Sequence, residues 1–196
     1  MRPHQFRHRT ARTFFISPKC EMAIAVGDPL MLHALQQAAL DRSVRSIHQQ
    51  AGPEIDCPQV SLAGVVLDRV DGSFLLGVHE TRPERSADEA SGLALILKRH
   101  GLRLLERDAT DIRQEPLFSN ARFAWSFVHY HVPITDRLRI ALALEDGGPQ
   151  SVLELEERAR PTCDTLAAVC ALACQDLVGI NISRDPLGPR TIVFAR

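Results

Sequence analysis

The stretch from Val60 to Pro83 constrains the fold of this chain more than any other part of the sequence. It reads VSLAGVVLDRVDGSFLLGVHETRP, in which two apolar runs, Val60–Leu67 and Phe74–Val78, flank the dipeptide Asp71-Gly72. An Asp-Gly pair between two β-rich runs favours a tight hairpin, because such a turn needs residues that accept a positive φ angle. We therefore predict a β-hairpin at the centre of the main sheet.

The segments around the hairpin predict a mixed sheet covered by helices. On the C-terminal side, Ser86 and Glu89 form a capping box that begins a helix, and Gly101 is placed to end it before an apolar strand at Leu102–Leu105. A strand, a helix and a strand in this order imply a right-handed parallel crossover. Upstream, a helical stripe over 28–40 precedes a short strand over 44–47. The fold class is therefore predicted to be α/β.

The composition suits a cytoplasmic protein with a real hydrophobic core. The chain has 196 residues, of which 45% are hydrophobic, enough for one ordinary domain or two small ones. It contains no apolar run of about 18 residues, so we expect no membrane span. Its five cysteines form no spaced framework, which favours a reduced compartment. The net charge of −1 gives no overall attraction for nucleic acid.

The pattern changes in the last third of the chain. An apolar helix around Trp125 connects to short helices predicted over 136–144 and 152–158 and after Pro161, and the strands Val178–Ile182 and Thr191–Phe194 follow as a ribbon. Three helices followed by a ribbon is the order of a winged helix. We therefore predict a basic N-terminal arm over 1–19, an α/β domain over 20–131 and a winged-helix-like domain over 132–196.

Residues from about 25 to 196 resemble the TnsA-type endonuclease subunit of heteromeric transposases. The most specific part is HGLRLLERDATDIRQEPLFSNARFAWSF, with its His100-Gly101 helix end, its Glu115-Pro116 step and the triplet at 120–122. The resemblance implies a restriction-endonuclease-like PD-(D/E)xK core followed by a winged helix. It also implies Mg²⁺-dependent cleavage of DNA, with an Asp on the strand before the turn, a Glu and a Lys two residues apart after it, and a Glu from the preceding helix.

The positions that the resemblance assigns to catalysis lack the required side chains. When Asp71-Gly72 is set on the family's turn, Gly64 stands at the Asp, Gly77 at the Glu and His79 at the Lys. The helix acid falls near Gly27 or Asp28, and a gapped alternative puts Gln59 at the Asp. Mg²⁺ needs carboxylate oxygens, which glycine cannot supply. We therefore expect a catalytically inactive protein without a metal cofactor.

One alternative keeps the enzyme activity. Asp68, Glu80 and Arg82 form a shifted set that, if it came together, would hold Mg²⁺ and make the chain an active DNA endonuclease with a migrated site. The plainer interpretation places Asp68 in the turn and Glu80 at a solvated strand end.

Two further hypotheses concern partners. Arginines of the arm and of the wing are candidates for phosphate contacts: Arg2, Arg7, Arg9, Arg12, Arg184 and Arg190. The third helix carries no Arg or Lys, so it is unsuited to reading a DNA groove. A DNA-binding or regulatory scaffold, linked to a mobile element or a DNA-processing complex, is one hypothesis. A pure interaction subunit, such as a homodimer formed through the apolar third helix, is the other.

Overall fold

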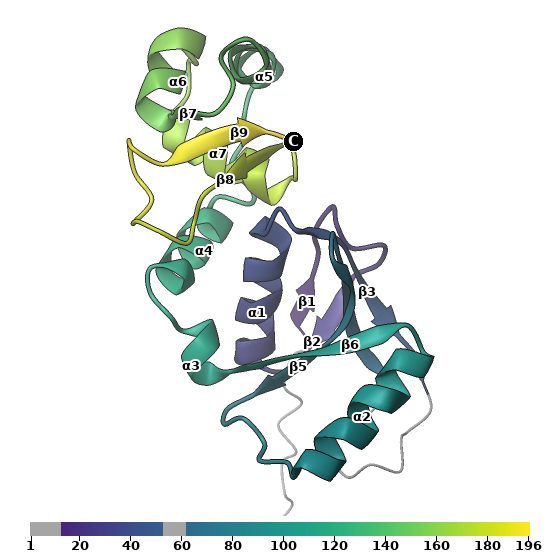
Figure 1. Ribbon diagram of the computed structural model, residues 1–196. Coiled ribbons are helices and arrows are strands. Elements are labelled where there is room, and N and C mark those ends of the chain that lie inside the picture. Colours follow the sequence, from purple (N-terminus) through teal and green to yellow (C-terminus); the bar gives the residue numbers. More distant parts are fainter. Residues whose placement is uncertain (1–12, 53–61) are drawn as a thin grey trace, which may run out of the picture.

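The computed structural model describes residues 13–52 and 62–196, and these form two stacked parts. The lower part in Figure 1 holds a mixed sheet with a helix on each face, and the upper part holds three helices and a small sheet. Helix α4 (Leu117–Ser126) packs on α1 (Pro29–Leu40) of the lower part and on α7 (Thr165–Cys174) of the upper part. The two parts therefore share one helix as a common support.

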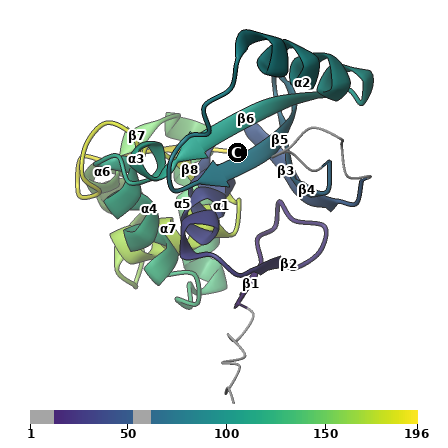
Figure 2. The same ribbon diagram turned by 90° about the horizontal axis from the view of Figure 1, so that it is seen from below.

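The main sheet has four strands in the order in which they occur along the chain: β3 (Val44–Gln50), β4 (Gly64–Arg69), β5 (Gly72–His79) and β6 (Leu102–Asp108). The first three strands pair antiparallel, and β5 pairs parallel with β6. Helix α1 covers one face, and α2 (Ala87–Arg99) covers the other (Figure 2). The predicted mixed α/β sheet flanked by helices is confirmed.

The hairpin forms as predicted, with a small shift of its turn. Arg69 pairs with Gly72, so the two residues of the loop are Val70 and Asp71. Gly72 closes the loop with a φ of 131°, a conformation that L-residues with a side chain rarely adopt. The glycine was correctly identified as the residue that permits the turn, although it lies at the first paired position.

The crossover between the parallel strands also matches the sequence. Ser86 and Glu89 make the reciprocal hydrogen bonds of a capping box, and Gly101 follows the helix with a φ of 69°. Strand β6 continues past Leu105 to Asp108, because Glu106 and Arg107 still pair with β5. The apolar run predicted only the first half of this strand.

The basic arm is shorter than predicted. Strand β1 (Thr13–Phe15) pairs antiparallel with β2 (Ile24–Val26), and Phe15 is buried against Trp125. Residues 13–19 therefore belong to the folded part, because they contribute a buried aromatic ring. The predicted phosphate contacts Arg2, Arg7, Arg9 and Arg12, and the gapped candidate Gln59, lie outside the described residues.

Helix α3 (Ala109–Ile112) leads into α4, and the upper part then follows the predicted order of three helices and a ribbon. Its elements are α5 (Ile134–Gly147), β7 (Gln150–Ser151), α6 (Val152–Ala159), α7, β8 (Val178–Ile180) and β9 (Ile192–Ala195). The strands form an antiparallel sheet in the order β7-β9-β8.

Helix α7 is the centre of the upper core and does not form a surface. Nine of its ten residues are buried, and it packs against α4, α6 and β8. A helix that is apolar all round is buried all round, since no face of it favours water. This corrects the expectation that the apolar third helix offers a dimerisation face.

Polar contacts also hold α4 and the upper part against the lower part. The indole nitrogen of Trp125 donates to the carbonyl of Gln36 at 3.0 Å. Lys19 of the lower part donates to the carbonyl of Asp41 at 2.6 Å and lies 3.9 Å from the carboxylate of Asp176, which follows α7 and also pairs with Arg196. Within the described residues, no helix has the length and apolarity needed to span a bilayer.

Lys19 provides a test of this junction. Burial, helped by the nearby Arg196, lowers the pKa of Lys19 from 10.5 to about 8. Below pH 8 the buried ammonium is charged and reduces stability, whereas between pH 8 and 10.5 only the unfolded state still binds the proton. We expect the stability of the wild type relative to Lys19→Met to rise across that interval, by at most about 1.4 kcal/mol per pH unit.

The measurement is urea unfolding of both proteins at several pH values. The comparison is needed because burial raises the pKa of Cys170 and Cys174 to about 12, which makes stability fall above pH 9 in both proteins. Lys98, the other lysine, is exposed on α2, and Lys98→Met serves as the control with no such pH dependence. A Lys19→Met difference that is constant with pH would show that Lys19 is not desolvated.

Candidate functional site

Two of the residues that the resemblance assigns to catalysis, Gly64 and Gly77, lie in one row across the α2 face of the sheet. Gly64 pairs with Gln50 of β3, and Gly77 pairs with Glu106 of β6. Val65 pairs with Leu76, so the same register places Gly64 opposite Gly77. The fold thus brings the two positions together as the predicted hairpin requires, and both are glycines.

The space beside the two glycines is already filled. A Cβ on Gly77 would lie 3.2 Å from Nε2 of His79 and 3.4 Å from Cγ of Glu106, and a Cβ on Gly64 would lie 3.1 Å from Leu75. A side chain at either position would meet these neighbouring atoms at or below ordinary contact distance.

Glu106 is the carboxylate nearest to this row, and it is paired with Arg85 and lies beside His79. Its Oε2 accepts from Arg85 at 2.6 Å, and its Oε1 lies 3.4 Å from Nε2 of His79. The Arg85 and Glu106 side chains are only 11% and 15% exposed. Arg85 thus neutralises the charge of Glu106 in a largely buried ion pair. A Mg²⁺ site would need two or three carboxylates that are free to bind the metal, and this row offers one that is already paired.

The shifted set of Asp68, Glu80 and Arg82 is not assembled. Asp68 lies near the hairpin turn, where it accepts from Ser46 at 2.7 Å and from Ser73 at 2.5 Å. Glu80 follows β5 at the opposite end, exposed and 3.6 Å from Arg113. At about 3.3 Å per residue, the seven residues from Ser73 to Glu80 keep the two acids roughly 20 Å apart.

The other members of these sets have structural partners as well. Arg82 pairs with Asp111 at 2.5 Å and approaches Asp108 at 3.7 Å. Asp28 caps α1 by accepting from the Leu30 amide at 2.9 Å. Among residues 13–52 and 62–196, no group of three His, Cys, Asp or Glu side chains is arranged to hold a metal ion.

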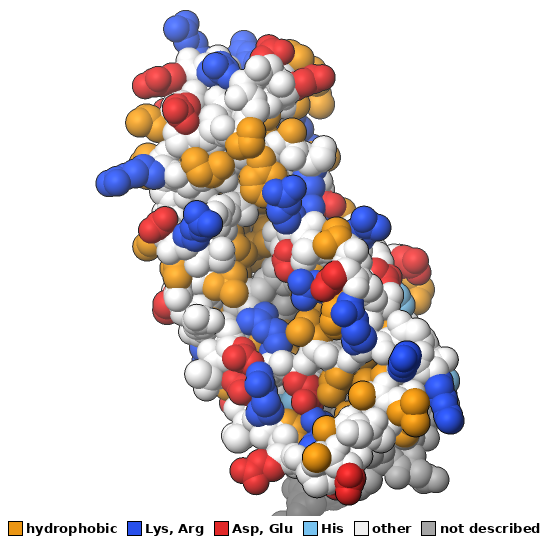
Figure 3. Space-filling model, viewed as in Figure 1, with side chains coloured by type: hydrophobic (Ala, Val, Ile, Leu, Met, Phe, Trp, Pro, Cys, Tyr) orange, Lys and Arg blue, Asp and Glu red, His pale blue; other side chains and the backbone are white. Residues whose placement is uncertain are grey.

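A different site opens on the α1 face of the sheet, in the cleft between the two parts. The cleft has a volume of about 600 Å³ and is lined from below by α1, β4, β5 and β6, and from above by the loop 181–184 and Phe194. Figure 3 shows basic side chains around the hollow between the two parts. The arginines that line it are Arg42, Arg69, Arg107 and Arg184, and Asp41 is the one acid among the lining residues.

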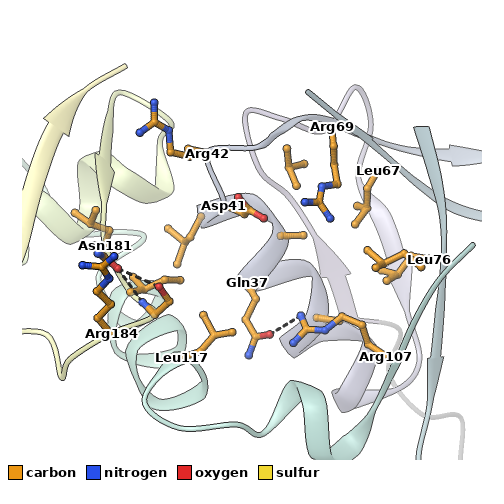
Figure 4. Close-up of a pocket in the computed structure, with 18 of the residues that line it drawn as sticks. Gln37, Asp41, Arg42, Leu67, Arg69, Leu76, Arg107, Leu117, Asn181 and Arg184 are labelled. Atoms are coloured by element: carbon orange, nitrogen blue, oxygen red, sulfur yellow. Dashed lines mark hydrogen bonds between the residues drawn. The ribbon is translucent and has the colours of Figure 1, made fainter. Parts of the chain in front are cut away.

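Three of the four cleft arginines form no ion pair with any described residue. Arg69 lies 3.4 Å from Asp71, whereas Arg42, Arg107 and Arg184 have no carboxylate within 4 Å in the described part of the chain. Arg107 is half-buried, and burial lowers its pKa. It is fixed by Gln37 at 2.8 Å and by the carbonyl of Asp111 at 2.9 Å (Figure 4).

The loop that carries Arg184 is anchored by one buried residue of α4. Asn120 donates to the carbonyls of Ile182 at 2.9 Å and Asp185 at 2.8 Å, and it accepts from the Leu187 amide at 2.9 Å. Of the two predicted wing arginines, Arg184 therefore lines the cleft, whereas Arg190 is exposed on the same loop outside the cleft lining. Asn120 belongs to the triplet that the sequence analysis singled out.

Comparison with known proteins gives no further guide. Neither the protein-family models nor the curated proteins contain a match to this chain.

Sequence reasoning missed the cleft because its arginines are far apart along the chain. Arg42, Arg69, Arg107 and Arg184 come from four different segments, and none belongs to a basic run. The sequence contained one weak signal for this site. Arg69 and Arg107 lie in strands whose side chains alternate between the two faces, and a charged side chain on the face that packs against a helix needs an explanation.

The role of Glu106 can be tested by Glu106→Gln. If the carboxylate serves to balance Arg85, its loss removes the 2.6 Å ion pair of a largely buried guanidinium, and we expect stability to fall by about 3 kcal/mol. Chemical denaturation measures the change. The control is Glu145→Gln, an exposed glutamate of α5 that should be neutral. A Glu106→Gln protein as stable as this control would show that the ion pair is not structural.

Proposed function

We propose that this protein is a catalytically inactive relative of TnsA-type nucleases that binds nucleic acid as a regulatory or scaffold subunit of a DNA-processing complex, such as that of a mobile element. The observation that carries the proposal is the row of Gly64, Gly77 and the ion-paired Glu106. The strand order and the two flanking helices agree with the restriction-endonuclease-like core that the resemblance implies, but the metal-holding oxygens are missing from it.

The order of elements in the upper part supports a winged-helix-like unit with an unusual surface. Its third helix is α7, which is buried and has no basic side chain, so it is unsuited to the major groove. Phosphate contact is assigned instead to the loop after β8, through the exposed Arg190, and to the basic segment with Arg2, Arg7, Arg9 and Arg12. Contacts of this kind bind phosphates without reading bases.

The first test measures binding of labelled duplex and single-stranded DNA at several salt concentrations. We expect affinity to fall steeply with salt, because each phosphate contact releases a counterion. Arg190→Gln should weaken binding at low salt and make the salt dependence less steep by about one contact. The exposed Arg45 of β3 offers the control Arg45→Gln, which should leave binding unchanged.

The same DNA incubated with Mg²⁺ or Mn²⁺ should stay intact. Metal-dependent cleavage that Glu106→Gln or Glu80→Ala abolishes would contradict the inactive state. An absence of any shift at low salt would contradict the nucleic-acid half of the proposal.

A second candidate function, a protein-interaction subunit without nucleic-acid contact, is favoured by one surface. Ile134, Leu138 and Leu142 form a stripe along α5 at a spacing of four residues, and they are 69%, 58% and 57% exposed. Large apolar side chains gathered on one helix face are typical of contact surfaces between proteins. This stripe replaces α7 as the place where a partner or a second copy would bind.

Light scattering of the purified protein tests this candidate. If two copies associate through α5, Leu138→Glu should turn a dimer into a monomer without lowering the thermal stability of the chain, because Leu138 is exposed. The control Leu153→Glu changes an exposed leucine on α6 instead. A dimer that survives Leu138→Glu would rule out α5 as the dimer contact.

A further inference from the structure

The cleft between the two parts has the charge of a receptor for anions. The lining holds four guanidinium groups and the carboxylate of Asp41, and Arg69 is also paired with Asp71 outside the lining, so an excess of two positive charges remains. The chain as a whole carries a charge of −1, so this excess is local. Low-dielectric walls around such a cleft concentrate its field and draw in an anion.

Arg107 makes the strongest argument that this anion is a ligand. A charged group in a partly dry site is costly unless an opposite charge compensates it. The partners that hold Arg107 are neutral: the amide oxygen of Gln37 and the carbonyl of Asp111. These bonds fix the guanidinium in place without an ion pair, and the carboxylates of Asp41, Asp108 and Asp111 act on it only from beyond ion-pair distance. A guanidinium held by neutral groups is preorganised to bind an anion directly.

The arginines face one another across the cleft. Figure 4 shows Arg69 and Arg107 reaching in from the sheet side, with Arg184 on the opposite wall beside Asn181. Asn120 anchors the loop of Arg184, so this wall is held in place from α4. An anion bound here would contact both parts of the molecule.

The rest of the lining is apolar, which argues against a bare inorganic ion as the ligand. Leucines and isoleucines from the sheet, α1, α4 and the loop after β8 line the cleft: Leu40, Leu67, Leu76, Leu105, Leu117, Ile180 and Ile182. The volume of about 600 Å³ is within the range of about 300–1,000 Å³ that pockets for small organic ligands have. The ligand therefore combines a phosphate-like group with an apolar body.

Planar side chains and an amide group in the lining indicate what the apolar body of the ligand is. The guanidinium of Arg42 lies 5.1 Å from the centroid of the Phe194 ring, which presents planar groups at the upper wall of the cleft. Arginine planes and aromatic rings stack on nucleobases, and guanidinium forks bind phosphate oxygens in pairs. The oxygen of the Asn181 amide is occupied by Ser183, so its NH₂ group has donors to offer.

We infer that this cleft is a binding site for a nucleoside phosphate, with the phosphate on Arg107, Arg69 and Arg184 and the base against Phe194 and the leucine wall. The inference does not rest on the proposed function, whose DNA contacts are assigned to Arg190 and the N-terminal arginines. The ligand is either a free nucleotide or the terminal nucleotide of a strand, since both present the same chemistry.

Isothermal titration calorimetry with the full chain tests the site, using AMP, GMP, CMP and UMP, adenosine, inorganic phosphate and a short 5′-phosphorylated DNA strand. We expect at least one nucleotide, free or at the strand end, to bind at least tenfold more tightly than phosphate or adenosine. Arg107→Gln should weaken that binding by about tenfold or more, as expected when a charge-assisted contact is lost.

Three further variants separate a loss of ligand contact from a loss of folding. Arg42→Gln changes an exposed cleft arginine without touching the bonds of Arg107, and it should weaken binding several-fold in a protein with an unchanged melting temperature. Arg45→Gln and Arg190→Gln lie outside the cleft lining and should bind the nucleotide like the wild type.

The source of the nucleotide follows from the titrations. Tight binding of a free nucleotide identifies a small-molecule site, and tight binding of the strand alone, lost in Arg107→Gln, identifies a strand end. Equal affinity for phosphate and AMP would overturn the inference, because it would show an anion site without a place for the base. An absence of binding, or binding that neither Arg107→Gln nor Arg42→Gln weakens, would overturn it as well.

Discussion

The pairing of β4 with β5 is the constraint on which the rest of this structure depends. It fixes which residues share a face of the sheet, and a shift of one residue would exchange the two faces. In the register observed, Val65, Leu67 and Leu76 face α1, whereas Val66 and Leu75 face α2. The same register sets Gly64 opposite Gly77 and Gly77 beside Glu106. The meeting of the two glycines and their place beside Glu106 are therefore two consequences of one strand pairing.

The two faces of the sheet treat charge in opposite ways. On the α2 face, Glu106 is paired with Arg85, so little net charge remains for a ligand or a metal. On the α1 face, Arg107 is held by neutral groups and keeps its charge. An ion pair cancels the net charge of its two members, whereas a guanidinium bonded to neutral groups keeps its positive charge. The second face is therefore the one suited to binding an anion. The site of interest thus lies across the sheet from the row of glycines.

The upper part of the molecule contributes one wall of the cleft and does not expose a DNA-recognition helix. Burial of α7 on all sides supplies the core that holds α5, α6 and the small sheet together, at the expense of a surface for DNA. What this part offers to the outside is the loop after β8, pinned by Asn120, and the apolar stripe of α5. Its position against α1 and α4 creates the cleft.

By itself, the sequence determined the local elements. The glycine-closed hairpin, the capping box at Ser86, the end of α2 at Gly101, and the order of the main helices and strands all follow from turn chemistry and periodicity, which act over a few neighbouring residues. The resemblance added the two glycine positions of the candidate site. Only the tertiary structure decided that residues 13–19 join the fold and that α7 is buried. It alone assembled the arginine cleft, because four residues separated by up to 142 positions meet only through packing between elements, and no local pattern records such a meeting.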